Sequence, residues 1–304
     1  MKGATEQVIN KLQHSVFRIE DEQEFRTKFD RESFMVRHNL ADDPLFKFDR
    51  LFAVVKTKVD RGEAFWDMGD MKINTRWSEM PAKSMSISEA LERIESAKAW
   101  IDLRAIHTEP DYQAILDAGM SQVERFSGLD FRRYVKLKDS ILFITSPRRV
   151  TNYHIDRECS MLLQIRGEKT IHIFDRKDRD LLPEGEIERF WTVDNNAPRY
   201  REQYQNRATS YRLTPGQAVH IPVNCPHWLE NGDGVSISLN INFHYRDFVR
   251  ADLYRANYLL RRLGLAPSAP GHSVVRDTLK RTVIGKPISI VKTLKHKLER
   301  LSKR

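Results

Sequence analysis

The chain has 304 residues, of which 40% are hydrophobic and 31% are charged, and its formal net charge is +9. A chain of this length can bury a substantial core, as one elaborated domain or as two. It has no apolar run of membrane-spanning length, no leader-like apolar segment at its start, and no pairing motif around Cys159 and Cys225. We therefore expect a cytoplasmic protein with reduced thiols rather than a secreted or membrane-spanning one.

Residues 1–140 mix helical and strand patterns, and we expect them to form a flank that completes the central domain. The segment 87–102 has helical periodicity, with Ser88 as a candidate N-cap and Glu89 in the first turn. The segment 43–58 fits a helix or a strand. Three tryptophans are expected in the core or beside a barrel rather than in a substrate groove: Trp66, Trp77 and Trp100.

Residues 141–246 contain a series of short strands separated by turns. An apolar strand follows His154, Gly167 marks a turn, and a second strand begins at Lys169. Pro215-Gly216 marks another turn, and the later sequence VSISLNINFHY alternates apolar and polar residues. The pattern predicts a mainly β domain with flanking helices, a double-stranded β-helix of the jelly-roll type.

The sequence VTNYHID at 150–156 places a histidine and an aspartate in H-x-D spacing. Because side chains alternate along a strand, His154 and Asp156 are expected to point to the same side. The dipeptide alone is weak evidence, since a surface histidine beside an aspartate explains it more simply.

A further histidine, His227, follows His154 by 73 positions and lies at an expected strand edge. Two histidines and one carboxylate form the ligand set of a mononuclear non-haem Fe(II) site, which leaves coordination positions open. We therefore interpret His154, Asp156 and His227 as candidate metal ligands. His220 is the rival for the third ligand, although it lies within a strand. Two other histidines are expected to be packed or solvated: His172 and His244.

An insert at about 176–210 is expected to form a substrate lid or a plain surface loop. The region 247–304 is expected to be helical and basic, because ten Lys or Arg and only two acidic residues follow from Arg276 onward, leaving +8. Five apolar residues share one helical face there: Ile290, Val291, Leu294, Leu298 and Leu301. This face could pack on the body or on a twin subunit, while nucleic acid and a membrane surface are alternative partners.

The order and spacing of these strands and motifs resemble the Jumonji-C (JmjC) branch of the cupin superfamily. The resemblance is closest to its asparaginyl-hydroxylase type, which inhibits hypoxia-inducible factor. Four stretches between about 141 and 246, a third of the chain, carry it: ILFITSPRRVTNYHID, RGEKTIHIF, PGQAVHIPVNCPHW and LNINFHYR. The resemblance implies an Fe(II)- and 2-oxoglutarate-dependent dioxygenase.

The resemblance implies three Fe(II) ligands: His154, Asp156 and His227. Lys169 matches the lysine that holds the distal carboxylate of 2-oxoglutarate, and Thr151 matches the hydroxyl that supports the same carboxylate. Without the resemblance, Lys169 would be interpreted as a solvated lysine after a turn. Asn242 matches an asparagine near the iron and the co-substrate, and Asn240 lies on the same strand face.

The chain departs from the family pattern at three places. Gln217 stands where an aspartate is usual, His220 replaces an aromatic residue, and Cys225-Pro226 replaces a pair of tryptophans. These changes leave the candidate ligands intact but alter the pocket wall. The substrate of the asparaginyl hydroxylase therefore cannot be transferred to this chain.

With O2 as the oxidant, the resemblance implies hydroxylation of a protein side chain or a small molecule, or demethylation through hydroxylation. Because Asp156 fills the carboxylate position, halogenation is disfavoured. The alternative is a cupin-fold binding or regulatory module without turnover, although the presence of Thr151 and Lys169 favours an enzyme. Relatives of this type often dimerise through C-terminal helices, so we expect a homodimer.

Overall fold

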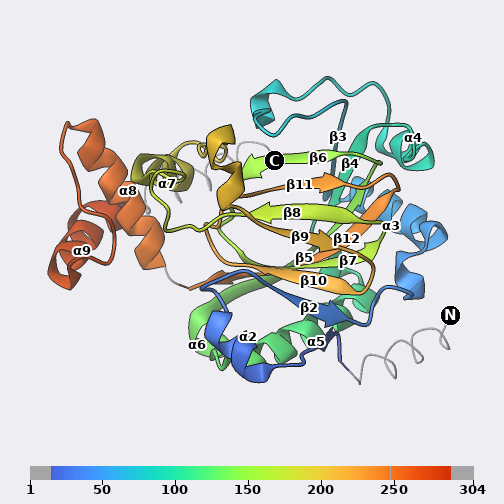
Figure 1. Ribbon diagram of the computed structural model, residues 1–304, viewed down its shortest axis with the longest axis horizontal. Helices are drawn as coiled ribbons and strands as arrows, with labels where there is room; N and C mark the ends of the chain where they lie inside the picture. The colour runs from blue at the N-terminus through green and yellow to red at the C-terminus, as the bar shows by residue number, and fades with distance from the viewer. Residues whose placement is uncertain (1–14, 247, 289–304) are drawn as a thin grey trace. The chain divides into compact units, whose positions relative to one another are not determined.

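The computed structural model describes residues 15–246 and 248–288 (Figure 1). They form two compact units, one made of residues up to 175 together with Glu202–Tyr245, and the other of Arg176–Arg201 together with the residues from Arg246 onward. The division at 140 and 246 expected from the sequence stays a prediction. The apolar positions at 290, 291, 294, 298 and 301 lie outside the described residues.

The first unit contains two antiparallel sheets, and the larger sheet has eight strands. Their order across the sheet is β1 (Phe17–Arg18), β2 (Phe34–His38), β10 (Gln217–Ile221), β7 (Cys159–Arg166), β12 (Ser236–Tyr245), β5 (Val135–Thr145), β4 (Ala99–Leu103) and β3 (Ala64–Met68). The smaller sheet has the order β6 (Val150–His154), β11 (His227–Asn231), β8 (Lys169–Ile173) and β9 (Thr209–Leu213). These strands include the two expected after His154, and His227 lies at the start of β11, in agreement with its expected place at a strand edge.

The two sheets face each other across an apolar interior. One cluster of buried residues draws members from both sheets: Leu162, Ile171, Ile173, Leu213, Val219, Ile221, Cys225 and Leu229. Alternate side chains of the same strands point the other way, as period-two patterning requires. The predicted mainly β jelly-roll with flanking helices is confirmed. Both cysteines are buried and form no disulfide, in agreement with the expected reduced thiols.

Helices cover the outer face of the larger sheet. They are α2 (Glu22–Lys28), α3 (Phe48–Asp60), α4 (Ile87–Glu92), α5 (Pro110–Ser127) and α6 (Phe131–Tyr134), with 3-10 turns η1 (Pro44–Phe46), η2 (Trp77–Glu79), η3 (Ile106–Thr108) and η4 (Glu202–Arg207) elsewhere in the unit. The longest helix, α5, contacts β5 and β12 (Figure 1). It approaches β12 closely at Gly119, where a Cβ would lie 3.0 Å from the Ile241 side chain. An alanine at this position would require the Ile241 side chain to shift by a few tenths of an ångström.

The helix expected over 87–102 is shorter than predicted, and its N-cap is a different residue. The N-cap is Ser86, not Ser88. The Ser86 hydroxyl oxygen accepts the backbone N–H of Glu89, and the Glu89 carboxylate accepts the backbone N–H of Ser86. This capping box fixes the start of the helix at Ile87. The prediction was wrong from Arg93 onward, because Ala99–Leu103 pairs as β4 with β3 and β5. Tertiary pairing overrides local helical periodicity here.

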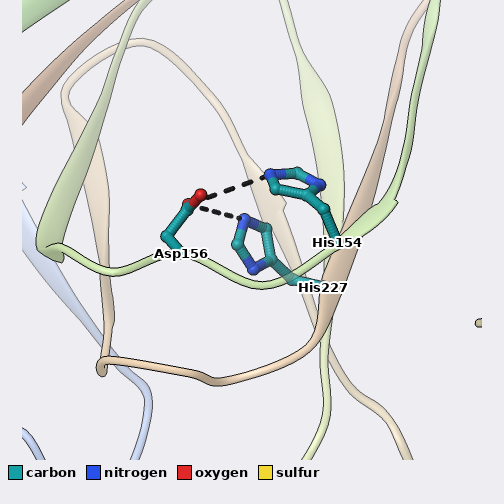
Figure 2. A group of neighbouring side chains, drawn as sticks. All are labelled: His154, Asp156 and His227. Atoms are coloured by element: carbon teal, nitrogen blue, oxygen red, sulfur yellow. Dashed lines mark ion pairs between the residues drawn. The ribbon is translucent and has the colours of Figure 1, made fainter. Parts of the chain in front are cut away.

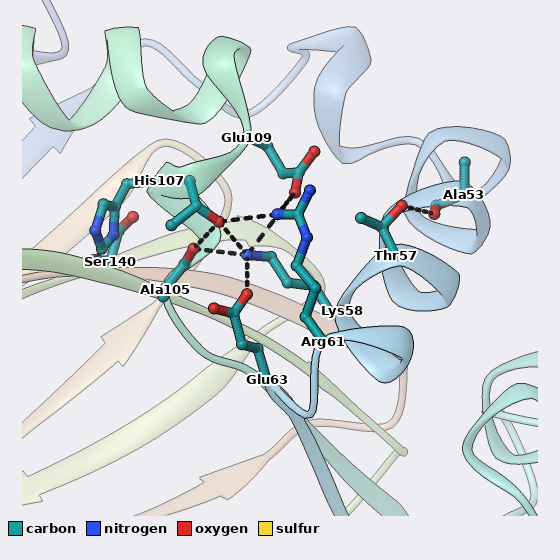
Figure 3. Close-up of polar contacts among 10 residues, drawn as sticks. Ala53, Thr57, Lys58, Arg61, Glu63, Ala105, His107, Glu109 and Ser140 are labelled. Atoms are coloured by element: carbon teal, nitrogen blue, oxygen red, sulfur yellow. Dashed lines mark hydrogen bonds and ion pairs between the residues drawn. The ribbon is translucent and has the colours of Figure 1, made fainter. Parts of the chain in front are cut away.

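The segment 43–58, which fitted a helix or a strand, forms η1 and most of α3. Near the end of α3 the ammonium group of Lys58 is fully buried, and Figure 3 shows it at the centre of a polar network. It donates to Glu63 Oε2 at 2.9 Å, to the Ala105 carbonyl at 2.7 Å and to Thr108 Oγ1 at 2.7 Å. All three protons of the ammonium therefore have acceptors.

Replacing Lys58 by alanine is expected to lower the free energy of unfolding by about 3 kcal/mol, because it leaves three oriented acceptors without their cation. The matched control is Lys28→Ala, which removes an exposed lysine paired with Glu24 one helical turn away. The control is expected to change stability by less than about 0.5 kcal/mol. Urea unfolding of both variants measures the difference, and equal losses would show that Lys58 has no special role.

Stability is expected to fall below pH 6.5 because of buried His38. Its Nδ1 accepts the Leu40 N–H at 3.1 Å, and its Nε2 donates to the Gln164 carbonyl at 2.9 Å. Protonation of Nδ1 would remove the first bond, so the two occur together only with the neutral ring. Burial lowers the pKa of His38 from 6.5 to about 4. Between these values the unfolded chain binds the proton and the folded chain does not, so this contribution disappears as the pH falls from 6.5 to 4.

The loss attributable to His38 is about 3 kcal/mol over that window. Urea unfolding at pH 7 and pH 4 measures it, with His38→Asn as the comparison. The variant is expected to be less stable at pH 7 but to lose less on acidification. An identical pH slope in both proteins would contradict the assignment.

The second unit consists of helices α7 (Glu184–Thr192), α8 (Phe248–Arg262) and α9 (Val274–Lys280), followed by a single π turn, η5 (Arg281–Gly285). The buried Glu188 of α7 accepts from Arg261 of α8 at 2.7 and 3.0 Å, and the Trp191 ring stacks on Tyr254. The sequence predicted a lid or a loop for this insert and did not predict its helix. The described part of the C-terminal region is helical, as predicted. Within the described ranges, no helix is long and apolar enough to cross a membrane.

Candidate functional site

The structure brings His154, Asp156 and His227 together in the smaller sheet, where β6 ends and β11 begins (Figure 2). The carboxylate Oδ2 of Asp156 lies 3.8 Å from His154 Nε2 and 3.6 Å from His227 Nε2. Ligand atoms of all three residues lie within 4.8 Å of one another. No other group of three or more His, Cys, Asp or Glu residues with this spacing is found in the described part of the chain.

Strand pairing explains why residues so distant in sequence meet. His154 ends β6 and His227 begins β11, and the two residues are direct partners across the antiparallel pair. Their rings lie 4.2 Å apart between centroids. Asp156 follows two residues beyond the end of β6. Although 73 positions separate them, with β7, β8, α7, β9 and β10 in between, the pairing of β11 with β6 brings the two histidines together.

Backbone carbonyl groups select the tautomer of both histidines. His154 Nδ1 lies 2.6 Å from the Asn152 carbonyl oxygen, and His227 Nδ1 lies 2.9 Å from that of Cys225. Because a carbonyl oxygen only accepts, each Nδ1 donates and each Nε2 carries a lone pair. Both lone pairs belong to the nitrogen atoms nearest the Asp156 carboxylate. Two such imidazoles and one carboxylate fit a facial Fe(II) ligand set.

Burial keeps His227 neutral. Desolvation, assisted by the neighbouring His154, lowers the pKa of His227 to about 4, although Asp156 acts in the opposite direction. Metal binding requires a neutral imidazole. The ring is therefore ready to bind a cation at neutral pH without first losing a proton.

A β-bulge places Thr151 on the same face as the metal ligands. Two steps along β11, from His227 to Leu229, correspond to three steps along β6, from His154 to Thr151. The extra residue in β6 reverses the usual alternation, so positions three apart share a face. The sequence motif could not show this, because strict alternation predicts opposite faces for these two residues.

Lys169 lies on the same inner face, further along the smaller sheet. It pairs with Asn231 of β11, four residues from His227, which is about 13 Å along the strand. Its side chain is only 6% exposed, and no carboxylate of the described residues pairs with it. Burial lowers the pKa of Lys169 to about 7. The interpretation as a solvated turn lysine is therefore wrong, since Lys169 is buried and has no counter-ion in the described part of the chain.

The turn before Lys169 depends on glycine. Gly167 has φ +69°, and a Cβ there would collide with the carbonyl oxygen of Val235. Only glycine combines this conformation with so close a backbone approach. The turn thus fixes the register of β8, and this register places the Lys169 side chain in the interior.

Asn240 and Asn242 both point into the interior, as expected for residues two apart on β12. Asn240 pairs with Leu162 of the interior cluster, and Asn242 pairs with Ser160. The Oδ1 atom of each asparagine is buried without a hydrogen-bond partner among the described residues. Both amides are thus available to a bound molecule.

The other histidines have structural surroundings. His220, the rival ligand, accepts the Asp30 N–H through Nε2 at 2.9 Å and donates from Nδ1 to the Ser160 carbonyl at 3.1 Å, so neither nitrogen is available to a metal. His172 stacks on Trp228 with a centroid distance of 4.1 Å. His244 Nε2 lies 3.4 Å from a carboxylate oxygen of Glu158. The structure agrees with the expectation that these three do not belong to the metal group.

Trp77 lies beside the site, which the favoured interpretation of the tryptophans did not anticipate. Its ring meets His154 edge to face at 6.2 Å, and the residue is 37% exposed. The backbone of the preceding segment is held against β6, because Ile73 O accepts the Tyr153 N–H and Thr75 O accepts the Asn152 amide. Trp66 and Trp100 lie on β3 and β4, as barrel residues should.

Comparison with known proteins places the chain in a family. Residues 10–248 match the cupin-like domain, which is more than half of the chain, and the protein therefore belongs to the cupin-like domain family. The match extends well beyond the 141–246 stretch that carried the resemblance.

Two curated relatives share part of the chain. HSPB1-associated protein 1 of Rattus norvegicus is 27% identical over 112 residues, and that of Homo sapiens is 28% identical over 115 residues. Each match covers 34% of this chain and 23% of the relative. The similarity therefore spans less than a quarter of the length of these relatives.

Solved structures of one bacterial protein share the fold. The X-ray structure of E. coli ycfD has a TM-score of 0.51 and 14% identity, over 87% of this chain and 67% of that chain. A structure of the same protein, described as a ribosomal oxygenase in complex with cobalt and 2-oxoglutarate, has a TM-score of 0.48 and 12% identity, over 87% and 65%. At 14% identity, the similarity to the first of these structures establishes the fold alone.

Proposed function

We propose that this protein is an Fe(II)- and 2-oxoglutarate-dependent oxygenase, in which 2-oxoglutarate, O2 and a substrate C–H bond give succinate, CO2 and a hydroxylated substrate. The observation that carries the proposal is the inner face of the smaller sheet, because its two ends fit the metal and the distal carboxylate of 2-oxoglutarate. One end has two imidazoles and a carboxylate, and the other has a buried lysine without a counter-ion among the described residues.

The residues present fit both groups. His154, Asp156 and His227 would hold Fe(II) through Nε2 and carboxylate oxygen atoms. Lys169, supported by Thr151, would bind the distal carboxylate of the co-substrate, for which a buried cation is a strong, charge-assisted partner. When bound, the metal and co-substrate would supply the oxidation of a C–H bond by O2.

The chain itself would orient the reactants and exclude water. The Asn152 and Cys225 carbonyl groups hold the two imidazoles in one tautomer and direction. The apolar cluster between the sheets shields the co-substrate site from solvent. Trp77 is placed to form a wall beside the metal.

Formation of succinate tests the proposal. Purified protein is incubated with Fe(II), ascorbate, 2-oxoglutarate and O2, and succinate is measured with and without candidate substrates. We expect iron-dependent succinate formation by wild type and none by His154→Ala. Iron binding without succinate would favour the alternative, a cupin-fold binding module. Formaldehyde release with a methylated substrate would instead indicate demethylation.

We also propose that the C-terminal helical region joins two copies of the chain. Val275, Leu279 and Val283 are spaced four residues apart and are 79%, 63% and 63% exposed. Such a row of exposed apolar side chains is typical of an interface.

Light scattering is expected to give twice the chain mass of 35.7 kDa for wild type. The dimer is expected to weaken at least about tenfold in Leu279→Lys, because a lysine cannot be buried there without a partner. Val193→Lys, which changes an exposed apolar residue outside the row, is the control. A monomeric wild type would overturn this proposal.

A further inference from the structure

The outer face of the smaller sheet carries a buried aromatic side chain next to a metal ligand. Side chains alternate along β11, so His227 and Leu229 point to the interior and Trp228 points to the opposite face. The next outward-facing pair of β8 and β11, Thr170 and Glu230, is polar. Trp228 is nevertheless only 7% exposed, so other parts of the chain must cover its ring.

The 3-10 turn η4 covers this ring through the side chain of Gln205. The Gln205 Oε1 atom accepts the N–H of the Trp228 ring at 3.1 Å, and the Gln205 amide nitrogen donates to His172 Nδ1 at 3.2 Å. One amide group therefore bridges the two rings. The hydroxyl of Ser210 on β9 donates to the same His172 nitrogen at 2.7 Å.

The rings of His172 and Trp228 also stack on each other. Their centroids lie 4.1 Å apart and their planes differ by 17°. The two residues are direct partners across β8 and β11, and Ser210 is the next partner in the same row. Such cross-strand pairs hold neighbouring strands together on one face of a sheet. We call His172, Gln205 and Trp228 the outer clamp.

The outer clamp lies where the pairing of β11 with β6 is irregular. The register between these strands shifts between His227 and Leu229, so Trp228 is the β11 residue at the bulge. A bulge interrupts the regular backbone hydrogen bonds of a strand pair and increases its local twist. On this side, the start of β11 is therefore restrained less than it would be in a regular ladder. On its other side, β11 pairs with β8 in regular register, and the outer clamp reinforces that side.

The orientation of His227 depends on how the start of β11 is held. The bond from His227 Nδ1 to the Cys225 carbonyl, at 2.9 Å, selects the tautomer. Before His227, the backbone is held by the bond from the Phe174 N–H to the Pro226 carbonyl at 2.9 Å. After His227, the adjacent residue is Trp228, whose ring is fixed by the outer clamp. Release of that ring would let the peptide between the two residues tilt, and the imidazole would tilt with it.

We propose that His172 and Gln205 are positioning residues for the metal centre, which hold Trp228 and thereby fix the orientation of His227 from the outer face of the sheet. The inference rests on the proposed oxygenase function, because it concerns the same metal group. Neither residue is a metal ligand, and His172 lies on the face opposite the ligands. The affinity of a metal site depends on such supporting contacts, because they keep the ligand atoms in place before the metal binds.

Anaerobic titration with Co(II) tests the proposal, because the visible absorption of this ion depends on the identity and geometry of its ligands. His172→Ala is expected to weaken Co(II) binding about tenfold and to change the absorption spectrum. His172→Phe keeps a ring that can stack on Trp228, and its affinity is expected to stay within about threefold of wild type. The matched control is Thr170→Ala, on the same strand and face but one row farther from His227. It is expected to change the affinity by less than about twofold.

Gln205→Leu provides a second test that leaves the strands themselves unchanged. Leucine removes both amide hydrogen bonds, so Co(II) binding is expected to weaken about threefold to fivefold. The absorption is expected to shift in the same direction as in His172→Ala. Thermal unfolding of the metal-free variants reports their folding. Variants that unfold at a lower temperature but keep the wild-type Co(II) affinity and spectrum would show a purely structural role and overturn the inference.

The wild-type titration separates this inference from the function on which it rests. Co(II) binding by wild type, with unchanged affinity in His172→Ala and Gln205→Leu, contradicts the positioning role alone. Failure of wild type to bind Co(II) contradicts the oxygenase proposal, and the positioning role with it.

Discussion

Replacing Asp156 with alanine is expected to lower the affinity for Fe(II) by at least about 100-fold and to abolish succinate formation. The carboxylate is the only anionic member of the group, and it lies within 4 Å of both Nε2 atoms. Without it, two neutral imidazoles remain, and these hold a dication far less well than the complete set. Iron binding is measured by anaerobic calorimetry, with succinate formation measured in parallel.

The informative control is Glu158→Gln, which removes a neighbouring carboxyl group that is not in the metal group. If Asp156 acts as a ligand, the control is expected to change iron affinity by less than about threefold, since only a nearby charge is affected. Equal losses in both variants would mean that general negative potential, rather than ligation by Asp156, attracts the metal.

The three candidate metal ligands could be predicted from the sequence because their motif depends on local spacing. The H-x-D spacing predicted that His154 and Asp156 lie close together, although Asp156 follows the end of β6 rather than lying on the strand, and β11 pairs with β6 at His227 and His154. Family resemblance added Thr151 and Lys169, which the residues alone did not support. The structure gives a physical basis for both, through the bulge in β6 and the burial of Lys169.

Other features depend on which distant strands become neighbours, and no local pattern encodes this. Residues 99–102 continued a helical pattern, yet they pair between two strands as part of β4. Asp139 and Asn242 likewise become neighbours only because β5 pairs with β12. The polar network around Lys58 similarly joins α3 to a turn some fifty residues later.

Replacing Lys169 with methionine is expected to raise the 2-oxoglutarate concentration needed for half-maximal succinate formation by about 10- to 100-fold. The loss of one charge-assisted contact, worth about 1.5–3 kcal/mol, accounts for this range. Methionine fills the same space in the interior without the ammonium group. Fe(II) affinity is expected to stay within about threefold of wild type, because Lys169 lies about 13 Å along the strand from His227.

The same substitution is expected to stabilise the ligand-free protein, which separates a binding role from a structural one. Burial lowers the pKa of Lys169 to about 7 from its ordinary value of 10.5, so the unfolded chain holds the extra proton between these values. The wild type should therefore gain stability as the pH rises from 7 to 10.5, by roughly 3 to 5 kcal/mol, and Lys169→Met should lack that contribution. Urea unfolding at pH 7 and pH 10 measures this.

A variant that is less stable than wild type at pH 7 would show that Lys169 supports the fold, and its effect on 2-oxoglutarate would then have a structural cause. If Lys169 serves to bind 2-oxoglutarate, we expect Lys169→Met to be more stable than wild type and to bind the co-substrate more weakly.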